Sequence, residues 1–165
     1  MTPRAVLIGP PAAGKTRLGK RIARRLGVGF VDTDSRVVAD HGPIPAIFKR
    51  FGEPQFREWE RAAVVEALTT DGVVSLGGGA IVDDATQRDL ENLTVILVTA
   101  SPEKVAPRLL LGNRPLLADG IESWKRLVAA RQPIYDRLAD IVVDTGLATM
   151  DSIADDVAAQ LRLRT

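Results

Sequence analysis

The stretch Gly9-Pro10-Pro11-Ala12-Ala13-Gly14-Lys15-Thr16 follows directly on the apolar run Ala5-Val6-Leu7-Ile8. Its eight residues fit the pattern G-x-x-x-x-G-K-[ST], a loop that wraps nucleotide phosphates. The run before it has the length and apolar character of a short buried strand, and Leu18, Ile22 and Leu26 after it recur every four residues, as on one face of a helix. A glycine turn without function is the alternative, but this context favours a strand, a phosphate-binding loop and a helix.

The residue types of this loop suit phosphate chemistry. A tight turn directs successive backbone N–H groups inward, and the following helix adds its positive N-terminal end. Lys15 would reach the β- and γ-phosphates, and the hydroxyl of Thr16 suits Mg²⁺, which prefers oxygen ligands. Ala12 and Ala13 stand where many such loops carry a further glycine, and alanine carries an energetic cost at any positive φ. The loop therefore predicts phosphoryl transfer.

Length and composition predict one globular domain. The chain has 165 residues, of which 45% are hydrophobic and 26% charged, and no apolar run approaches the length of a membrane span. Residues 1–4 lead straight into the first strand, which leaves no secretory apolar region. Cysteine is absent, so neither a disulfide framework nor a thiolate metal site is expected. These features predict a cytoplasmic protein without a membrane partner.

The charge balance argues against a nucleic-acid partner. Lysine and arginine total 22 against 21 acidic residues, which gives no large field of one sign. The basic residues of the first helix are expected to form its solvated face: Arg17, Lys20, Arg21, Arg24 and Arg25.

Apolar segments alternate with helical patterns along the chain. Strands are predicted at residues 5–8, 28–31, 73–76, 94–98 and 141–143. Helices are predicted at residues 15–26, 35–40, 44–51, 54–68, 85–91, 102–111, 122–138 and 150–163. Such alternation favours an α/β fold with a parallel sheet covered by helices on both faces, and ligands then collect beyond the carboxyl ends of the strands. The turn-like stretch Gly112-Asn113-Arg114-Pro115 is a natural place for a lid.

Two carboxylates follow the second predicted strand in Asp32-Thr33-Asp34. One can serve magnesium, while the other faces a substrate hydroxyl and deprotonates or orients it. The alternative is that both only cap the helix that starts near Ser35, a position that aspartate favours. This segment alone leaves the two interpretations equally open.

Glycines and arginines supply further candidates. Gly77, Gly78 and Gly79 follow the third predicted strand, where missing side chains favour close approach of a ligand over a plain flexible loop. Arg57 and Arg131 sit on predicted helices, and guanidinium groups bind carboxylates through two hydrogen bonds. Spacing alone does not separate these two from ordinary surface arginines. His41 is expected to be a turn residue, and the two tryptophans, Trp59 and Trp124, are expected to pack.

Taken in order, these pieces resemble the shikimate kinase family. Besides the loop, the Asp32-Thr33-Asp34 segment and the three glycines, the resemblance rests on three motifs: residues 52–60 as G-E-x-x-F-R-x-x-E, Arg114-Pro115-Leu116-Leu117, and Arg131-Gln132-Pro133-Ile134-Tyr135. It covers nearly the whole chain. A nucleoside monophosphate kinase or another small-molecule P-loop kinase is the alternative, but it gives no reason for the glycines beside the two arginines.

The resemblance implies a P-loop NTPase of nucleoside monophosphate kinase type with a five-stranded parallel sheet. Residues 1–165 would form one domain, with a substrate-binding helical segment at about 33–61 and a lid at about 109–121. The implied reaction uses ATP and Mg²⁺ to phosphorylate the 3-hydroxyl of shikimate to shikimate 3-phosphate, in the biosynthesis of chorismate and the aromatic amino acids. The enzyme is expected to be a monomer.

On the substrate side, the resemblance makes Asp34 the hydroxyl-binding group and base. Arg57 and Arg131 would hold the carboxylate of shikimate, and the backbone of residues 77–79 would contact its ring. Glu60 lies one helical turn after Arg57, where it can orient the guanidinium.

On the nucleotide side, the resemblance gives Lys15 and Arg114 the task of neutralising charge on the transferring phosphoryl group. Arg114 would come from the lid. Thr16 and Asp32 would serve magnesium, and Arg108 would stack on adenine.

Overall fold

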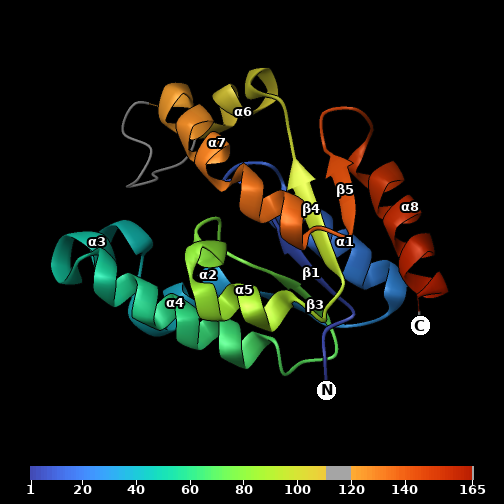
Figure 1. The fold of residues 1–165 in the computed structure, drawn as a ribbon, viewed down its shortest axis with the longest axis horizontal. Coiled ribbons are helices and arrows are strands. Elements are labelled where there is room, and N and C mark those ends of the chain that lie inside the picture. Colours follow the sequence, from blue (N-terminus) through green and yellow to red (C-terminus); the bar gives the residue numbers. More distant parts are fainter. Residues whose placement is uncertain (111–119, 165) are drawn as a thin grey trace.

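Five parallel strands form the sheet at the centre of the fold (Figure 1). The computed structural model describes residues 1–110 and 120–164. The strands, in spatial order, are β2 (Phe30–Asp32), β3 (Val73–Ser75), β1 (Ala5–Ile8), β4 (Val95–Thr99) and β5 (Ile141–Asp144). The expected five-stranded parallel sheet is thus confirmed.

The second strand begins two residues later than predicted. Val28 N–H donates to the carbonyl of Ala23 at 3.0 Å, and Gly27 adopts φ 68°, so both residues close the end of the preceding helix. The apolar character of Val28 reflects packing against the main core and not membership of the strand.

The helices occupy the predicted segments to within a few residues, and one short 3₁₀ turn was not predicted. They are α1 (Lys15–Leu26), α2 (Thr33–His41), α3 (Ile44–Phe51), α4 (Glu53–Ala67), η1 (Ala80–Val82, the 3₁₀ turn), α5 (Asp84–Leu90), α6 (Pro102–Leu109), α7 (Ile121–Leu138) and α8 (Met150–Leu163). None of the described helices is long and apolar enough to span a bilayer.

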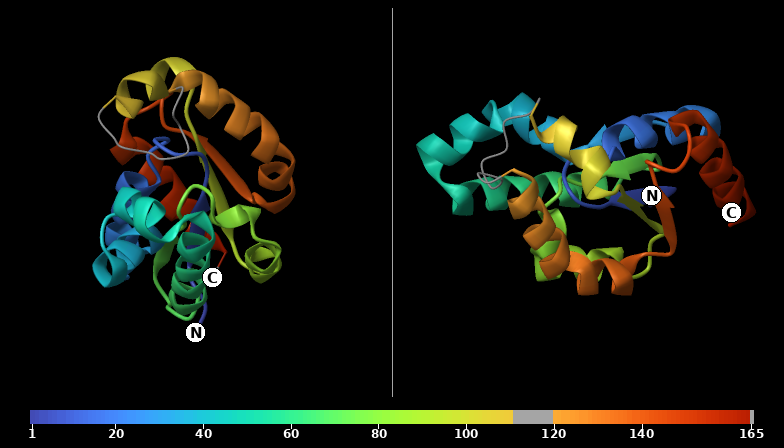
Figure 2. Two further views of the ribbon diagram at one scale, coloured as in Figure 1. Left: turned by 90° about the vertical axis from the view of Figure 1, so that its left-hand side faces the viewer. Right: turned by 90° about the horizontal axis from the view of Figure 1, so that it is seen from above.

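Helices cover both faces of the sheet, as the alternation predicted. Ala5 and Leu7 of β1 belong to a core shared with α1 and α8. Val6 and Ile8, which point the other way, belong to a second core with α4, α5 and α7. Seen from above (Figure 2, right), the blue α1 and red α8 lie on one side of the strands and α5 and α7 on the other.

A smaller apolar cluster joins α2, α3 and α4 beyond the edge of the sheet (Figure 1). It centres on Val37, Ile47 and Phe56. His41, predicted as a turn residue, ends α2 and stacks on Trp59 with the ring centroids 3.7 Å apart. Both residues therefore have a packing role in these helices.

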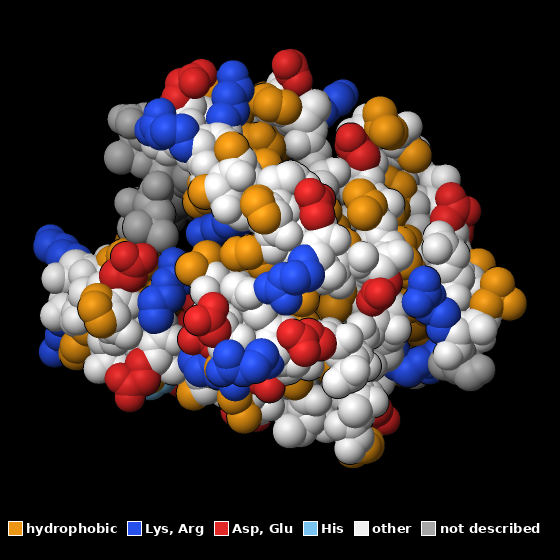
Figure 3. Space-filling view, viewed as in Figure 1, with side chains coloured by type: hydrophobic (Ala, Val, Ile, Leu, Met, Phe, Trp, Pro, Cys, Tyr) orange, Lys and Arg blue, Asp and Glu red, His pale blue; other side chains and the backbone are white. Residues whose placement is uncertain are grey.

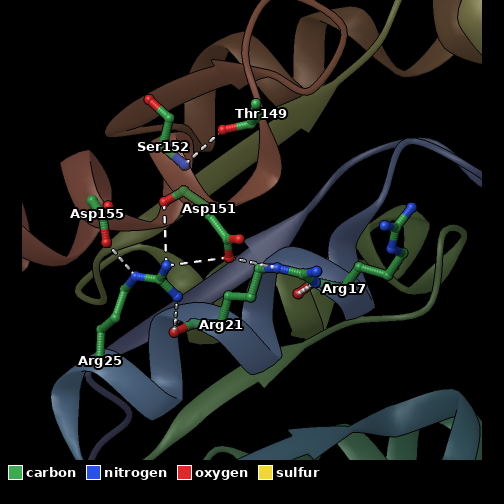
Figure 4. A network of polar contacts seen from close by, with 7 residues as sticks. All are labelled: Arg17, Arg21, Arg25, Thr149, Asp151, Ser152 and Asp155. Atoms are coloured by element: carbon green, nitrogen blue, oxygen red, sulfur yellow. Dashed lines mark hydrogen bonds and ion pairs between the residues drawn. The ribbon is translucent and has the colours of Figure 1, made fainter.

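The basic face of α1 is only partly solvated, contrary to expectation. Arg21 donates to Asp151 of α8 at 3.0 Å, and Arg25 pairs with both Asp151 and Asp155 (Figure 4). The bond to Asp155 raises the pKa of Arg25 further above its usual value. The two arginines therefore connect α1, the helix that follows the phosphate loop, to α8.

Candidate active site

The phosphate loop is closed by its own lysine. Lys15 is buried, and its Nζ donates to the carbonyls of Gly9 at 2.8 Å and Pro10 at 2.9 Å. Ala12 adopts φ 65°, and it is the one residue other than glycine with positive φ in the part of the chain that the structure describes. The cost expected for alanine in this loop therefore applies at Ala12.

Thr16 and Asp32 meet beside the loop. The hydroxyl of Thr16 donates to Oδ2 of Asp32 at 2.5 Å, while Oδ1 of Asp32 accepts from the backbone N–H groups of Asp34 and Ser35. Asp32 therefore does cap α2, but one of its oxygens still faces Thr16. A hydroxyl and a carboxylate oxygen side by side suit Mg²⁺, which takes few protein ligands and keeps several waters.

Asp34 lies in the first turn of α2 and does not act as the cap. Its side chain lies against the backbone of Gly77, where an added Cβ would be 2.3 Å from Oδ1 of Asp34. Only glycine fits this position, because any larger residue would displace the carboxylate. The structure thus gives Gly77 a role that the sequence did not suggest, which is to make room for Asp34.

One cavity of about 410 Å³ is lined by the loop, Asp32, Asp34, the three glycines and both candidate arginines. Arg57 comes from α4 and Arg131 from α7, and both side chains line this space. Arg131 is buried and donates to the carbonyl of Gly78 at 2.6 Å. Burial lowers its pKa from the usual value. The fold therefore places two guanidinium groups and a carboxylate around a space of small-molecule size.

Glu60 holds Arg57, as the helical spacing predicted. The guanidinium of Arg57 donates to Oε1 of Glu60 at 2.8 Å and lies 3.5 Å from Glu53, so two carboxylates orient it. A Cβ on Gly79 would lie 2.5 Å from Nη1 of Arg57, so this close approach requires glycine. Burial raises the pKa of Glu60 to about 7, with Asp34 adding to the rise and Arg57 opposing it.

We expect Glu60 to make folding stability depend on pH. In the unfolded chain its carboxyl titrates near 4.5, against about 7 in the folded protein. Between these values the folded state binds the extra proton, so stability falls as pH rises, by on the order of 3 kcal/mol over the interval. Glu60→Gln stays neutral and is expected to lose this component, so its unfolding free energy relative to the wild type rises with pH.

Urea denaturation of both proteins between about pH 5 and pH 7.5 measures the difference. Glu58→Gln is the matched control, because Glu58 lies on the exposed side of the same helix. Parallel pH profiles for Glu60→Gln and the wild type would contradict the titration of Glu60 in this range.

Some predicted residues lie outside the described part of the chain. They include Arg114 and most of the expected lid, since residues 111–119 are not described. Arg108, near the end of α6, donates to the carbonyl of Ala12 at 2.8 Å and so reaches the phosphate loop. Its stacking on adenine stays a prediction.

The sequence did not identify several residues that line the cavity. Ile44 and Phe48 of α3 give it an apolar wall, and the amphipathic pattern of that helix was the available signal. Arg17 was assigned to the solvated face of α1, yet it also lines the cavity. Figure 4 shows its side chain directed away from the acidic residues of α8. Its position directly after Thr16 could have indicated this.

The family model and the curated relatives indicate one family. A family model described as shikimate kinase matches residues 11–162. A shikimate kinase of Rhodococcus erythropolis is 46% identical over 88% of this chain and 89% of the relative. That of Mycobacterium avium is 42% identical over 98% and 94%. The solved shikimate kinase from Acinetobacter baumannii in complex with shikimate superposes with a TM-score of 0.90 at 29% identity, over 99% of this chain and 94% of that one.

These matches extend over both the sheet and the site. The fold is that of the P-loop nucleoside monophosphate kinases, with a five-stranded parallel sheet. The chain belongs to the shikimate kinase family.

Proposed function

We propose that this chain transfers the γ-phosphoryl group of ATP to the 3-hydroxyl of shikimate, which gives shikimate 3-phosphate for the biosynthesis of chorismate and the aromatic amino acids. Membership of the shikimate kinase family sets the reaction class. The observation that supports this proposal most directly is that Asp34, Arg57 and Arg131 line one cavity together with the phosphate loop. This arrangement suits a small substrate with both a hydroxyl and a carboxylate.

Asp34 receives the proton of the reacting hydroxyl. The 3-hydroxyl oxygen forms a bond to the γ-phosphorus while the bond between that phosphorus and the β–γ bridging oxygen breaks, and ADP leaves. Lys15 neutralises charge that develops on the transferring group, and Arg114 of the lid does the same. Because little covalent chemistry is required of the protein, orientation and charge neutralisation supply most of the rate enhancement.

The substrate is held by its carboxylate. Arg57 and Arg131 approach from two helices, and each can form two hydrogen bonds to a carboxylate. The backbone of Gly77, Gly78 and Gly79 contacts the ring. Glu60 keeps the guanidinium of Arg57 in position through its 2.8 Å bond.

Magnesium is the proposed metal cofactor. Thr16 and Asp32 would hold it, directly or through its waters, and the ion would neutralise phosphate charge when bound. Arg108 is proposed to stack the face of its guanidinium on adenine while Nη1 donates to the carbonyl of Ala12. Residues 1–165 form one domain, with substrate-binding helices at about 33–61 and a lid at about 109–121.

The protein is proposed to act as a cytoplasmic monomer without a nucleic-acid or membrane partner. The face seen in Figure 3 agrees with the absence of a nucleic-acid partner, because its acidic and basic side chains are interspersed. The formal net charge of +1 also provides little attraction for a polyanion.

A coupled ADP-release assay with shikimate, quinate, gluconate and AMP side by side tests the function. We expect ADP release with shikimate to exceed that with every other compound. Preferred turnover of AMP would support a nucleoside monophosphate kinase instead. Absence of turnover with all four would indicate a nucleotide-binding module without catalysis.

Removing either arginine is expected to weaken shikimate binding selectively. A hydrogen bond to a charged group contributes roughly 1.5 to 3 kcal/mol, so Arg131→Ala should lower shikimate affinity by about one to two orders of magnitude. Binding of an ATP analogue should barely change. Arg131→Lys should recover only part of the loss, because an ammonium group cannot reproduce the planar guanidinium.

Isothermal titration of each variant with shikimate and, separately, with the ATP analogue measures both effects. Arg126→Ala is the matched control, since Arg126 lies on the exposed side of the same helix as Arg131. Unchanged shikimate affinity in both Arg57→Ala and Arg131→Ala would rule out the carboxylate clamp.

A further inference from the structure

Side chains bind every carbonyl of the phosphate loop from residue 9 to residue 13. Lys15 binds the first two, as described above. The other three accept one hydrogen bond each from side chains far along the chain: Pro11 from Nε1 of Trp124 at 2.8 Å, Ala12 from Nη1 of Arg108 at 2.8 Å, and Ala13 from the hydroxyl of Thr145 at 2.6 Å. These carbonyls of the loop are thus held by side chains from α7, from α6 and from the turn after β5.

Holding these carbonyls also orients the donors of the loop. In a trans peptide the C=O and the following N–H point in opposite directions, so the carbonyl of Pro11 determines where the N–H of Ala12 points. Pro10 and Pro11 have no N–H, so phosphate binding by the loop backbone depends on the residues from Ala12 onward. The bond from Trp124 to Pro11 therefore orients the first available donor in this part of the loop.

The same peptide precedes the strained residue. Ala12, at φ 65°, is in a left-handed conformation that is unfavourable for an L-residue, and such strain persists only when the surroundings hold it. The carbonyl of Pro11 accepts a hydrogen bond from Trp124, and the carbonyl of Ala12 accepts one from Arg108. These two side chains are therefore well placed to maintain the turn.

Trp124 combines apolar packing with a directed hydrogen bond to the phosphate loop. Its side chain is buried on α7 with Ala100 and Val105, and Ala12 and Leu127 pack against the same cluster. A buried indole N–H is costly without an acceptor, so the bond to Pro11 also determines the orientation of the ring. Since α7 carries Arg131 as well, this bond links the helix of the substrate carboxylate site to the nucleotide loop.

We propose that Trp124 is a positioning residue of the nucleotide site, whose N–H holds the strained turn at Ala12 and so orients the backbone donors for phosphate. The inference rests on the proposed use of a nucleotide by this loop. We therefore expect nucleotide affinity to depend on the indole N–H of Trp124 and not only on the packing of its ring.

Trp124→Phe keeps a buried aromatic ring but removes the donor. We expect ADP affinity, measured by isothermal titration with Mg²⁺ present, to fall roughly tenfold, because a buried carbonyl loses its partner. The KM for ATP should rise by a similar factor, with a smaller change in kcat. Shikimate affinity without nucleotide should stay unchanged, which shows that the variant is folded. Trp59→Phe, on α4, is the control and should bind ADP normally.

Ala12→Gly provides the decisive second test. Glycine adopts positive φ without the cost that alanine carries, so in the Trp124→Phe background it should restore at least half of the lost binding free energy, or about threefold in ADP affinity. Ala12→Gly alone completes the double-mutant cycle. If the indole served only as packing, the double variant would bind ADP as weakly as Trp124→Phe.

Fluorescence tests the same link with Trp124 intact. Of the two tryptophans in the chain, Trp59→Phe leaves only Trp124, so ADP should change the emission of that variant while shikimate alone changes it much less. The proposal is overturned if Trp124→Phe binds ADP within twofold of wild type, or if Ala12→Gly does not restore ADP affinity in that background. It is also overturned if Trp124→Phe loses shikimate affinity to the same extent as ADP affinity, or if ADP leaves the emission of Trp59→Phe unchanged. A wild-type protein that binds shikimate but not ADP would instead contradict the proposed function.

Discussion

Lys15→Ala is expected to reduce kcat by at least on the order of 10³, because the variant lacks the ammonium group that neutralises the charge developing on the transferred phosphoryl group. In the structure its Nζ lies within 2.9 Å of two loop carbonyls, so the ammonium is held at the phosphate loop. ADP release and circular dichroism, measured on the same preparation, separate loss of chemistry from loss of fold.

Lys20→Ala is the matched control, because Lys20 lies on the exposed face of the same helix. Its turnover should equal that of the wild type. A folded Lys15→Ala protein that kept most of its activity would end the interpretation of residues 9–16 as a catalytic phosphate loop.

Asp34→Asn is expected to lower kcat by roughly 10² to 10⁴, which is the usual contribution of a general base. Asparagine has nearly the same shape as aspartate, so it fits the space that Gly77 leaves open. Shikimate binding should therefore change far less than kcat. Steady-state kinetics with saturating ATP gives both quantities.

Asp40→Asn controls for this result, since Asp40 is exposed at the far end of α2. Turnover of Asp34→Asn within about threefold of wild type would show that the hydroxyl needs no carboxylate there. The assignment of Asp34 as the base would then be wrong.

Local patterns predicted most of the fold. Short-range periodicity, which can be read directly from the sequence, predicted the strand and the helix beside the phosphate loop. It also predicted the alternation of strands and helices from which the parallel sheet was inferred. The start of β2 was misplaced because Val28 is apolar for another reason, the closure of α1. The capping question at Asp32 required coordinates, because one carboxylate both caps α2 and accepts from Thr16.

Tertiary contacts account for the residues that local patterns missed. Nothing around Arg57 or Arg131 distinguishes them from surface arginines, and only the family resemblance singled them out before the fold brought them to one cavity. Trp124 was expected to pack, and it does, but its N–H bond spans 113 residues and has no local signature. The roles of Gly77 and Gly79 likewise depend on side chains from other elements.

The bond from Thr145 to Ala13 has a consequence for biosynthesis of the chain. It joins residues 132 positions apart, so the ribosome needs roughly 7 to 26 seconds after making Ala13 to supply its partner. Until then the nucleotide loop of a nascent chain lacks one of its three remote supports. Because a ligand stabilises only a state that can bind it, cellular ATP should protect the finished chain from unfolding and do much less for one still being translated.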